Sequence, residues 1–202
     1  MSAIKVVSRS LFAVAAAALW FAASPLAAGV SPWYLEGRAG QASVATNLGT
    51  VLPWRIEGDD TAAGVEVGYR ISRYVAVQAG YRDLGSYGGS RVPCREGDIC
   101  PLVLLIPETP VVADITGWSL TAVPRWPIGE RLSVFGKVGL FEWDADLSQR
   151  FGGGHVESFS EQDLLTGIGV QYAFPKGLGL QLQYEDYGLG ADATTAGASW
   201  RF

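Results

Sequence analysis

The segment FGGGHVES (residues 151–158) places the only histidine of the chain, His155, three residues before Ser158. A serine becomes a nucleophile when a base lies within hydrogen-bond reach and a third group orients that base. Glu157 supplies a carboxylate beside both residues, so the residue types needed for hydrolysis are present. Neighbours within one loop rarely reach that geometry, and a solvated loop histidine is the preferred interpretation. We therefore assign no catalytic residue.

The two cysteines, Cys94 and Cys100, enclose the segment CREGDIC. In an oxidising compartment, two cysteines in one exposed loop favour a local disulfide over a redox or metal role. One histidine and two cysteines leave little material for a zinc site. The acidic pairs at 59–60 and 144–146 lack the spacing of a calcium-binding loop. We expect no metal and no cofactor.

The first 28 residues have the layout of a secretory signal peptide. Lys5 and Arg9 precede an apolar run from Leu11 to Ala23, and small residues follow at 24–29. A spanning helix needs about 20 apolar residues, so this run is too short for an anchor. We expect cleavage near Ala28, export, and a domain that covers residues 29–202. An uncleaved anchor or a buried helix is the alternative.

The composition excludes several classes of protein. The 202 residues are 49% hydrophobic and 17% charged, and so many aromatic residues with so little charge exclude disorder. Fifteen Lys and Arg against 20 Asp and Glu form no basic face, so no nucleic-acid partner is expected. The 26 glycines argue against a helical bundle. Beyond the signal segment no apolar run is long enough for a membrane helix, which leaves a closed barrel as the only membrane-spanning option.

Period-two alternation dominates the rest of the chain. In residues 61–71, Val65 and Val67 share one face and Glu66 lies on the other, which predicts a strand rather than a helix. A tight turn at 72–73 follows, so the next strand is expected to be its antiparallel neighbour. Strands are predicted in this way at residues 33–40, 61–71, 74–82, 115–123, 133–143, 164–172, 178–186 and 194–202.

Eight antiparallel strands can close into a barrel that has no exposed edge. The expected connections at 72–73, 124–131 and 173–177 are short, whereas those at 41–60, 83–114, 144–158 and 187–193 are mostly longer and polar. Short turns at one rim and long loops at the other are typical of outer-membrane barrels, whose long loops face outward. The predicted fold class is all-β: an eight-stranded antiparallel up-and-down transmembrane β-barrel.

The two faces of the strands decide between a membrane barrel and a soluble one. The charged residues share the face opposite the aliphatic residues, and a lipid-facing Arg or Lys costs roughly 2–4 kcal/mol at the midplane. The charged face is therefore predicted to line the lumen, which in an eight-stranded barrel has room for side chains but not for a wide pore. A soluble periplasmic barrel is the alternative. The expected lumen charge network comprises Glu36, Arg38, Glu66, Arg70, Arg82, Lys137 and Glu185.

Aromatic residues gather near the short-turn ends of the predicted strands. Such residues form girdles at the membrane interface. The expected girdle comprises Trp33, Tyr34, Tyr74, Trp126, Tyr172, Phe174, Trp200 and Phe202.

Three segments resemble the small outer-membrane β-barrel proteins of OmpA and OmpX type. GVEVGYRISRYVAVQAGYRDLG (64–85) is similar to their second and third strands, and FGKVGLFEWDAD (135–146) is similar to their fifth. The ending SWRF, with Trp200 and Phe202, resembles the signal recognised by the barrel-assembly machinery. The resemblance spans residues 33–202, and because the chain stops at the last predicted strand we expect no peptidoglycan-binding domain. It implies a fold and an outer-membrane location rather than one particular role.

Together these observations favour a non-enzymatic, monomeric outer-membrane barrel with a plugged polar lumen. Its expected role is envelope integrity or surface interaction through long extracellular loops, one of which carries the apolar segment 101–110. The expected partners are outer-membrane lipids, lipopolysaccharide and the barrel-assembly machinery. One alternative is a narrow channel for small or hydrophobic solutes. The other is a lipid A-modifying hydrolase that uses His155 and Ser158.

Overall fold

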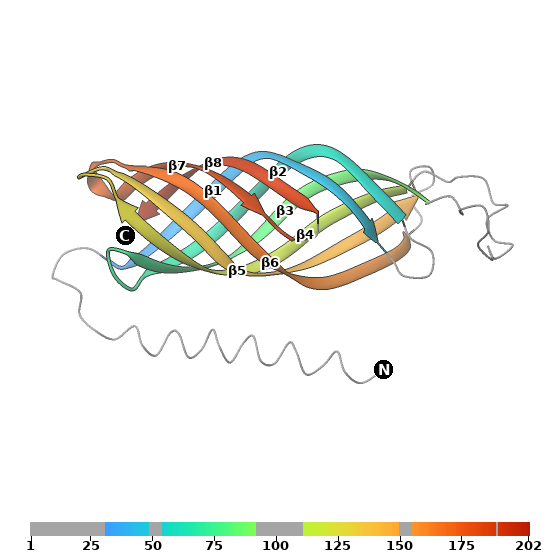
Figure 1. The fold of residues 1–202 in the computed structure, drawn as a ribbon, viewed down its shortest axis with the longest axis horizontal. Coiled ribbons are helices and arrows are strands. Elements are labelled where there is room, and N and C mark those ends of the chain that lie inside the picture. Colours follow the sequence, from blue (N-terminus) through green and yellow to red (C-terminus); the bar gives the residue numbers. More distant parts are fainter. Residues whose placement is uncertain (1–30, 49–53, 92–110, 150–154, 189) are drawn as a thin grey trace, which may run out of the picture.

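The computed structural model describes residues 31–48, 54–91, 111–149, 155–188 and 190–202, and these residues form one closed β-barrel (Figure 1). Within that part of the chain, no helix is long and apolar enough to cross a membrane. A short 3-10 helix, η3 (Pro175–Gly177), lies in the turn between the sixth and seventh strands. The strands are β1 (Trp33–Leu48), β2 (Trp54–Arg70), β3 (Val75–Arg91), β4 (Val111–Pro127), β5 (Leu132–Gln149), β6 (His155–Ala173), β7 (Leu178–Asp186) and β8 (Ala191–Arg201).

Each strand pairs antiparallel with its neighbours in the chain, and β1 closes the barrel against β8. The closing register runs from Tyr34 opposite Arg201 to Val44 opposite Ala191. The C-terminus lies at the end of the barrel that carries the short turns (Figure 1). The predicted fold class and the number of strands are confirmed. By the general rule for such barrels, the short-turn end faces the periplasm.

The predicted strand ends were wrong at the opposite, outer end. Most of the expected connections 41–60 and 144–158, and the two ends of 83–114, belong to strands, because β1 to β6 are 16 to 19 residues long. Crossing the membrane takes about 9–11 residues, so these six strands extend beyond it. The predicted bounds of β7, at 178–186, are correct.

The extension was missed because the polarity of both faces reverses along each strand. On β5 the outward face changes from Val138 and Leu140 to Asp144, whereas the inward face changes from Lys137 to Phe141. The geometric alternation of the strand continues unchanged through this point. The reversal marks the height at which the outer wall passes from lipid to water.

A belt of exposed aliphatic and aromatic side chains surrounds the barrel between this reversal and the periplasmic end. Trp33 and Tyr69 pack edge to face with ring centroids 4.9 Å apart, and Tyr172 and Phe174 do so at 4.8 Å. Tyr34 was wrongly assigned to this girdle, because it is 1% exposed and points into the lumen. The other expected girdle residues are exposed on the outer face: Trp33, Tyr74, Trp126, Tyr172, Phe174, Trp200 and Phe202.

Glycines on the inner face permit close approach of neighbouring strands, and Gly139 offers a direct test. A Cβ atom at Gly139 would overlap the carbonyl of Leu120 and the backbone of Thr121 on β4. We expect Gly139→Ala to lower the free energy of unfolding by about 1–3 kcal/mol, the usual cost of overpacking. Urea unfolding in detergent micelles, followed by tryptophan fluorescence, measures this change.

Gly37 provides the matched control for this substitution. It lies on the lipid-facing side of β1, and a Cβ atom there meets nothing within 4 Å. Gly37→Ala should therefore change the stability by less than about 0.5 kcal/mol. Equal losses in the two variants would mean that close approach of the strands is not what requires Gly139.

Candidate functional site

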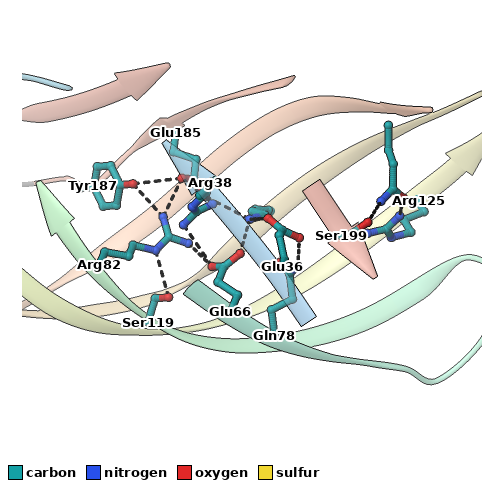
Figure 2. Close-up of polar contacts among 12 residues, drawn as sticks. Glu36, Arg38, Glu66, Gln78, Arg82, Ser119, Arg125, Glu185, Tyr187 and Ser199 are labelled. Atoms are coloured by element: carbon teal, nitrogen blue, oxygen red, sulfur yellow. Dashed lines mark hydrogen bonds and ion pairs between the residues drawn. The ribbon is translucent and has the colours of Figure 1, made fainter. Parts of the chain in front are cut away.

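The periplasmic half of the lumen holds a group of six charged side chains, which we call the charge network: Glu36, Arg38, Glu66, Arg82, Lys137 and Glu185. They come from β1, β2, β3, β5 and β7, and alternation within each strand turns them all inward. Three are acidic and three are basic, so the network is neutral as a whole. Figure 2 shows the carboxylates of two strands meeting the guanidinium groups of two others.

Glu66 is the hub of the charge network. Its Oε1 lies 3.2 Å from Nη2 of Arg38 and 2.5 Å from Nη2 of Arg82, and its Oε2 lies 2.9 Å from Nζ of Lys137. The side chains of these four residues are at most 2% exposed. One carboxylate therefore ties β2 to β1, β3 and β5 across the interior.

Arg82 connects this hub to the opposite wall. Its Nη1 lies 2.6 Å from Oε2 of Glu185 and donates a hydrogen bond of 2.8 Å to the hydroxyl of Tyr187. Its Nε donates to Oγ of Ser119 on β4 at 3.2 Å (Figure 2). Each nitrogen of this guanidinium thus has a partner, which is the condition under which a buried charge is tolerated.

Glu36 and Gln78 form the periplasmic edge of the charge network. Gln78 donates a hydrogen bond of 2.9 Å from Nε2 to Oε2 of Glu36. Lys137 lies 3.9 Å from the other oxygen of Glu36, a longer contact than its 2.9 Å to Glu66. Glu36 therefore holds its place mainly through the amide of Gln78.

Outward of the charge network, the lumen holds a cluster of buried apolar side chains, which we call the apolar plug. Phe141 and Tyr187 pack with ring centroids 4.9 Å apart, and Trp143 donates from Nε1 to Oδ2 of Asp163 at 2.8 Å. The prediction of a polar lumen therefore describes only the periplasmic half. The plug comprises Ala42, Val44, Ile56, Ala62, Leu84, Tyr87, Val111, Ala113, Ile115, Phe141, Trp143, Ala145, Leu147, Leu165, Tyr187, Ala191 and Ala193, with Phe159 packed against it.

Arg70 was expected to join the charge network, but the structure places it apart, at the periplasmic end of the lumen. Its guanidinium carbon lies 5.6 Å from the centre of the Tyr34 ring. Arg125 lies at the same end, where its Nη1 donates to Oε1 of Gln171 and where Figure 2 shows it separated from the network. The lumen thus has two polar levels.

Sequence reasoning missed three residues that contact these levels. Tyr187 was placed in the connection after β7, where the structure also has it, but its contact with Arg82 was missed. Arg125 was placed in a turn, although it belongs to β4. Ser119 lies in the strand predicted at 115–123, but no role was given to it. The available signal was alternation: Arg125 lies an even number of residues from Ser119, and Tyr187 lies an even number from Glu185.

Several predicted features lie outside the described residues. These are the signal peptide at 1–28, the cysteines Cys94 and Cys100, and the apolar segment 101–110. Ser158 lies on the exposed face of β6 opposite Asp146 of β5, but the side chain of His155 is not described. In the described part of the chain, no three His, Cys, Asp or Glu side chains are placed to hold a metal ion.

Comparison with solved structures identifies the same architecture in other bacteria. Neisserial surface protein A covers 86% of this chain and 99% of its own, with a TM-score of 0.60 and 16% identity. The N-terminal β-barrel domain of Pseudomonas aeruginosa OprF covers 86% of this chain and 100% of its own, with a TM-score of 0.51 and 16% identity. At this level of identity, these likenesses concern the fold alone.

Sequence comparison identifies the family. Outer membrane protein A of Yersinia pseudotuberculosis is 27% identical over 172 residues, which are 82% of this chain and 44% of that protein. Outer membrane protein A of Salmonella typhi is 30% identical over 141 residues, which are 67% of this chain and 35% of that protein. The chain therefore spans less than half the length of these relatives. The model of the OmpA-like transmembrane domain matches residues 29–200, and the chain belongs to this family of outer-membrane β-barrels.

Proposed function

We propose that this protein is a non-enzymatic outer-membrane barrel with a closed lumen. It would serve envelope integrity or surface contact through its outer wall, the part of strands β1 to β6 that extends beyond the membrane. The observation that supports the proposal is the presence of two successive layers of buried, inward-facing side chains in the lumen. The charge network is neutral and at most 2% exposed, and the apolar plug lies directly outward of it. A hydrated ion would have to break the first layer and cross the second.

The outer wall carries a group of outward-facing acidic residues just beyond the apolar belt. We call this group the acidic collar: Asp83, Asp114, Glu142, Asp144 and Asp146. Asp114 and Asp146 lie directly opposite each other on β4 and β5, an arrangement of like charges that destabilises a sheet unless cations offset it. Divalent cations shared with lipopolysaccharide phosphates would supply that compensation, because carboxylates are ligands that Ca²⁺ and Mg²⁺ prefer.

Export and assembly complete the proposal. The segment 1–28 would direct export and be removed, and Trp200 and Phe202 would be recognised by the assembly machinery. Trp200 lies on the outer face of β8 and Phe202 directly follows that strand; both are exposed, and their ring centroids lie 5.0 Å apart. Their position leaves them accessible while β8 is still unpaired. We also propose that the barrel acts as a monomer.

A complementation experiment tests the envelope role. The gene is deleted in its own host and restored as wild type or as the double variant Asp114→Asn, Asp146→Asn. We expect deletion to increase sensitivity to detergent, wild type to reverse this, and the collar variant to reverse it only partly. The asparagine at 114 keeps an oxygen that can accept the hydrogen bond from Ser86, so the variant should fold and reach the membrane normally.

Two measurements on the same strains and protein separate the alternatives. The purified barrel in planar bilayers should give no conductance above the protein-free baseline, and discrete openings would favour the channel. The mass of lipid A should be identical with and without the gene, and a loss or gain of acyl chains would favour the hydrolase. Unchanged detergent sensitivity after deletion would contradict the envelope role.

A further inference from the structure

Three arginines share the periplasmic end of the lumen with Tyr34, and we call Arg70, Arg125 and Arg201 the inner arginine cluster. The guanidinium carbons of Arg70 and Arg125 lie 5.6 Å and 5.8 Å from the centre of the Tyr34 ring. Arg201 is paired with Tyr34 across β1 and β8, so its side chain shares the inward face. Three strands, β2, β4 and β8, therefore bring positive charge to this end of the lumen.

The inner arginine cluster has no counter-charge among the described residues. No carboxylate there lies within ion-pair distance of these guanidinium groups. Glu36, the next inward residue on β1 after Tyr34, is held by Gln78 and Lys137 instead. Since the charge network is already neutral, it offers no spare negative charge. The cluster therefore leaves three positive charges uncompensated.

The polar atoms of this cluster are also short of partners. The Nε atoms of Arg70, Arg125 and Arg201 and the hydroxyl of Tyr34 are buried and make no hydrogen bond within the described structure. Arg125 is 5% exposed and Tyr34 is 1% exposed. The contact between Arg125 and Gln171, which continues to Ser199 at 2.8 Å, involves neutral groups that cannot cancel the charge.

Like charges held this close in a partly buried place repel one another more strongly than they would in water. Aromatic faces reduce the cost, since Arg125 also lies 5.4 Å from the Phe135 ring. Such contacts contribute much less than an ionic partner does. An arrangement of this kind is stabilised when an anion with several acceptor oxygens enters it.

We propose that the inner arginine cluster is a binding site for a phosphate group that enters from the periplasmic side. The planar guanidinium group presents paired N–H donors that match the oxygens of phosphate, and the Tyr34 hydroxyl adds a further donor. The phosphate can come from a free ion or from an anionic phospholipid headgroup of the inner leaflet. This site is separate from the outer wall on which the proposed function depends.

Phosphate titration of the purified barrel in zwitterionic detergent tests the site. Sodium phosphate is compared with sodium chloride at equal ionic strength, by calorimetry and by the midpoint of thermal unfolding. We expect phosphate, but not chloride, to bind and to raise the midpoint. Arg125→Gln and Arg70→Gln should each weaken phosphate binding about tenfold or more, because each removes charge-assisted hydrogen bonds.

Two controls make the result specific. Arg131 lies at the same end of the barrel but is exposed in the turn between β4 and β5, so Arg131→Gln should leave phosphate binding unchanged. In phosphate-free buffer, Arg125→Gln should unfold at the same or a higher temperature than wild type, because it relieves repulsion. Equal effects of phosphate and chloride, or an equal loss of binding in Arg131→Gln, would overturn the proposal.

Lipid nanodiscs in phosphate-free buffer then distinguish the two sources. A headgroup ligand predicts a higher unfolding midpoint in phosphatidylglycerol than in phosphatidylcholine, with the difference lost in Arg125→Gln. A free ion predicts no such difference but retains the response to added phosphate. The absence of both responses would exclude a phosphate site of either kind.

Discussion

Replacing Arg82 by methionine is expected to lower the free energy of unfolding by about 3–5 kcal/mol, the usual cost of removing one partner from a buried ion pair. Arg82 contacts both Glu66, at 2.5 Å, and Glu185, at 2.6 Å, so its loss leaves the network with one excess negative charge. Methionine fills similar space without a charge. Urea unfolding in phospholipid vesicles measures the loss, since the variant keeps all six tryptophans of residues 29–202 as reporters.

A surface pair and a double variant control this measurement. Arg55 pairs with Glu57 at 2.8 Å, but both side chains are at least 60% exposed, so Arg55→Met should cost less than about 1 kcal/mol. Adding Glu185→Gln to Arg82→Met restores a neutral network, and the double variant should be more stable than the sum of the two single losses predicts, by about 0.5–3 kcal/mol. Equal small losses for Arg82→Met and Arg55→Met would mean that the buried ion pairs of the network stabilise the barrel no more than an exposed pair does.

The barrel could be predicted from sequence because lipid imposes a simple rule on each strand. Within the membrane, every second residue must be apolar, and a charge must face the interior. Val65, Glu66 and Val67 obey this rule so clearly that both the strand and its orientation follow. The same rule placed Glu66, Arg82 and Lys137 on the lumen side, where the structure finds them buried.

Beyond the membrane the rule no longer applies, and there the sequence became ambiguous. Asp144 and Asp146 were interpreted as loop residues because acidic side chains replace the aliphatic ones. The structure shows them as outward residues of β5, opposite Thr116 and Asp114. On the inner face the change is the opposite one, because Trp143 and Leu147 pack in the plug. A strand that passes from lipid to water halfway along its length keeps its period-two alternation. Its outward face changes from apolar to polar, and its inward face changes from polar to apolar.

The partners within the lumen could not be derived from alternation alone. Alternation assigns a side chain to the inner or the outer face. Its height along the barrel axis depends on the strand register, because tilted strands are staggered around the barrel. Arg70 and Arg82 share an inward face, yet Arg70 lies at the last position of β2 and reaches Tyr34 instead of a carboxylate. The register therefore determines which basic residues pair with carboxylates in the charge network and which belong to the inner arginine cluster.

Truncating Trp143 to alanine is the second change for which we expect a large effect, a loss of about 3–5 kcal/mol in the free energy of unfolding. Trp143 is among the largest buried side chains of the barrel, and its indole N–H bonds Asp163. Removing it leaves a cavity in the plug together with an unpaired carboxylate, and closed strands have little freedom to collapse around that space. Heat-dependent mobility in SDS and circular dichroism measure the loss without relying on tryptophan emission.

Trp118→Ala is the matched control, because it makes the same chemical change on the outer face. Trp118 is 64% exposed and contacts Tyr81 edge to face at 5.1 Å, so its removal leaves a gap that detergent or lipid can fill. We expect a clearly smaller loss than for Trp143→Ala, with the folded form still resistant to SDS. If the two variants lost equal stability, the interior above the charge network would not be close-packed, and the argument that two layers of buried side chains close the lumen would fail at its outer layer.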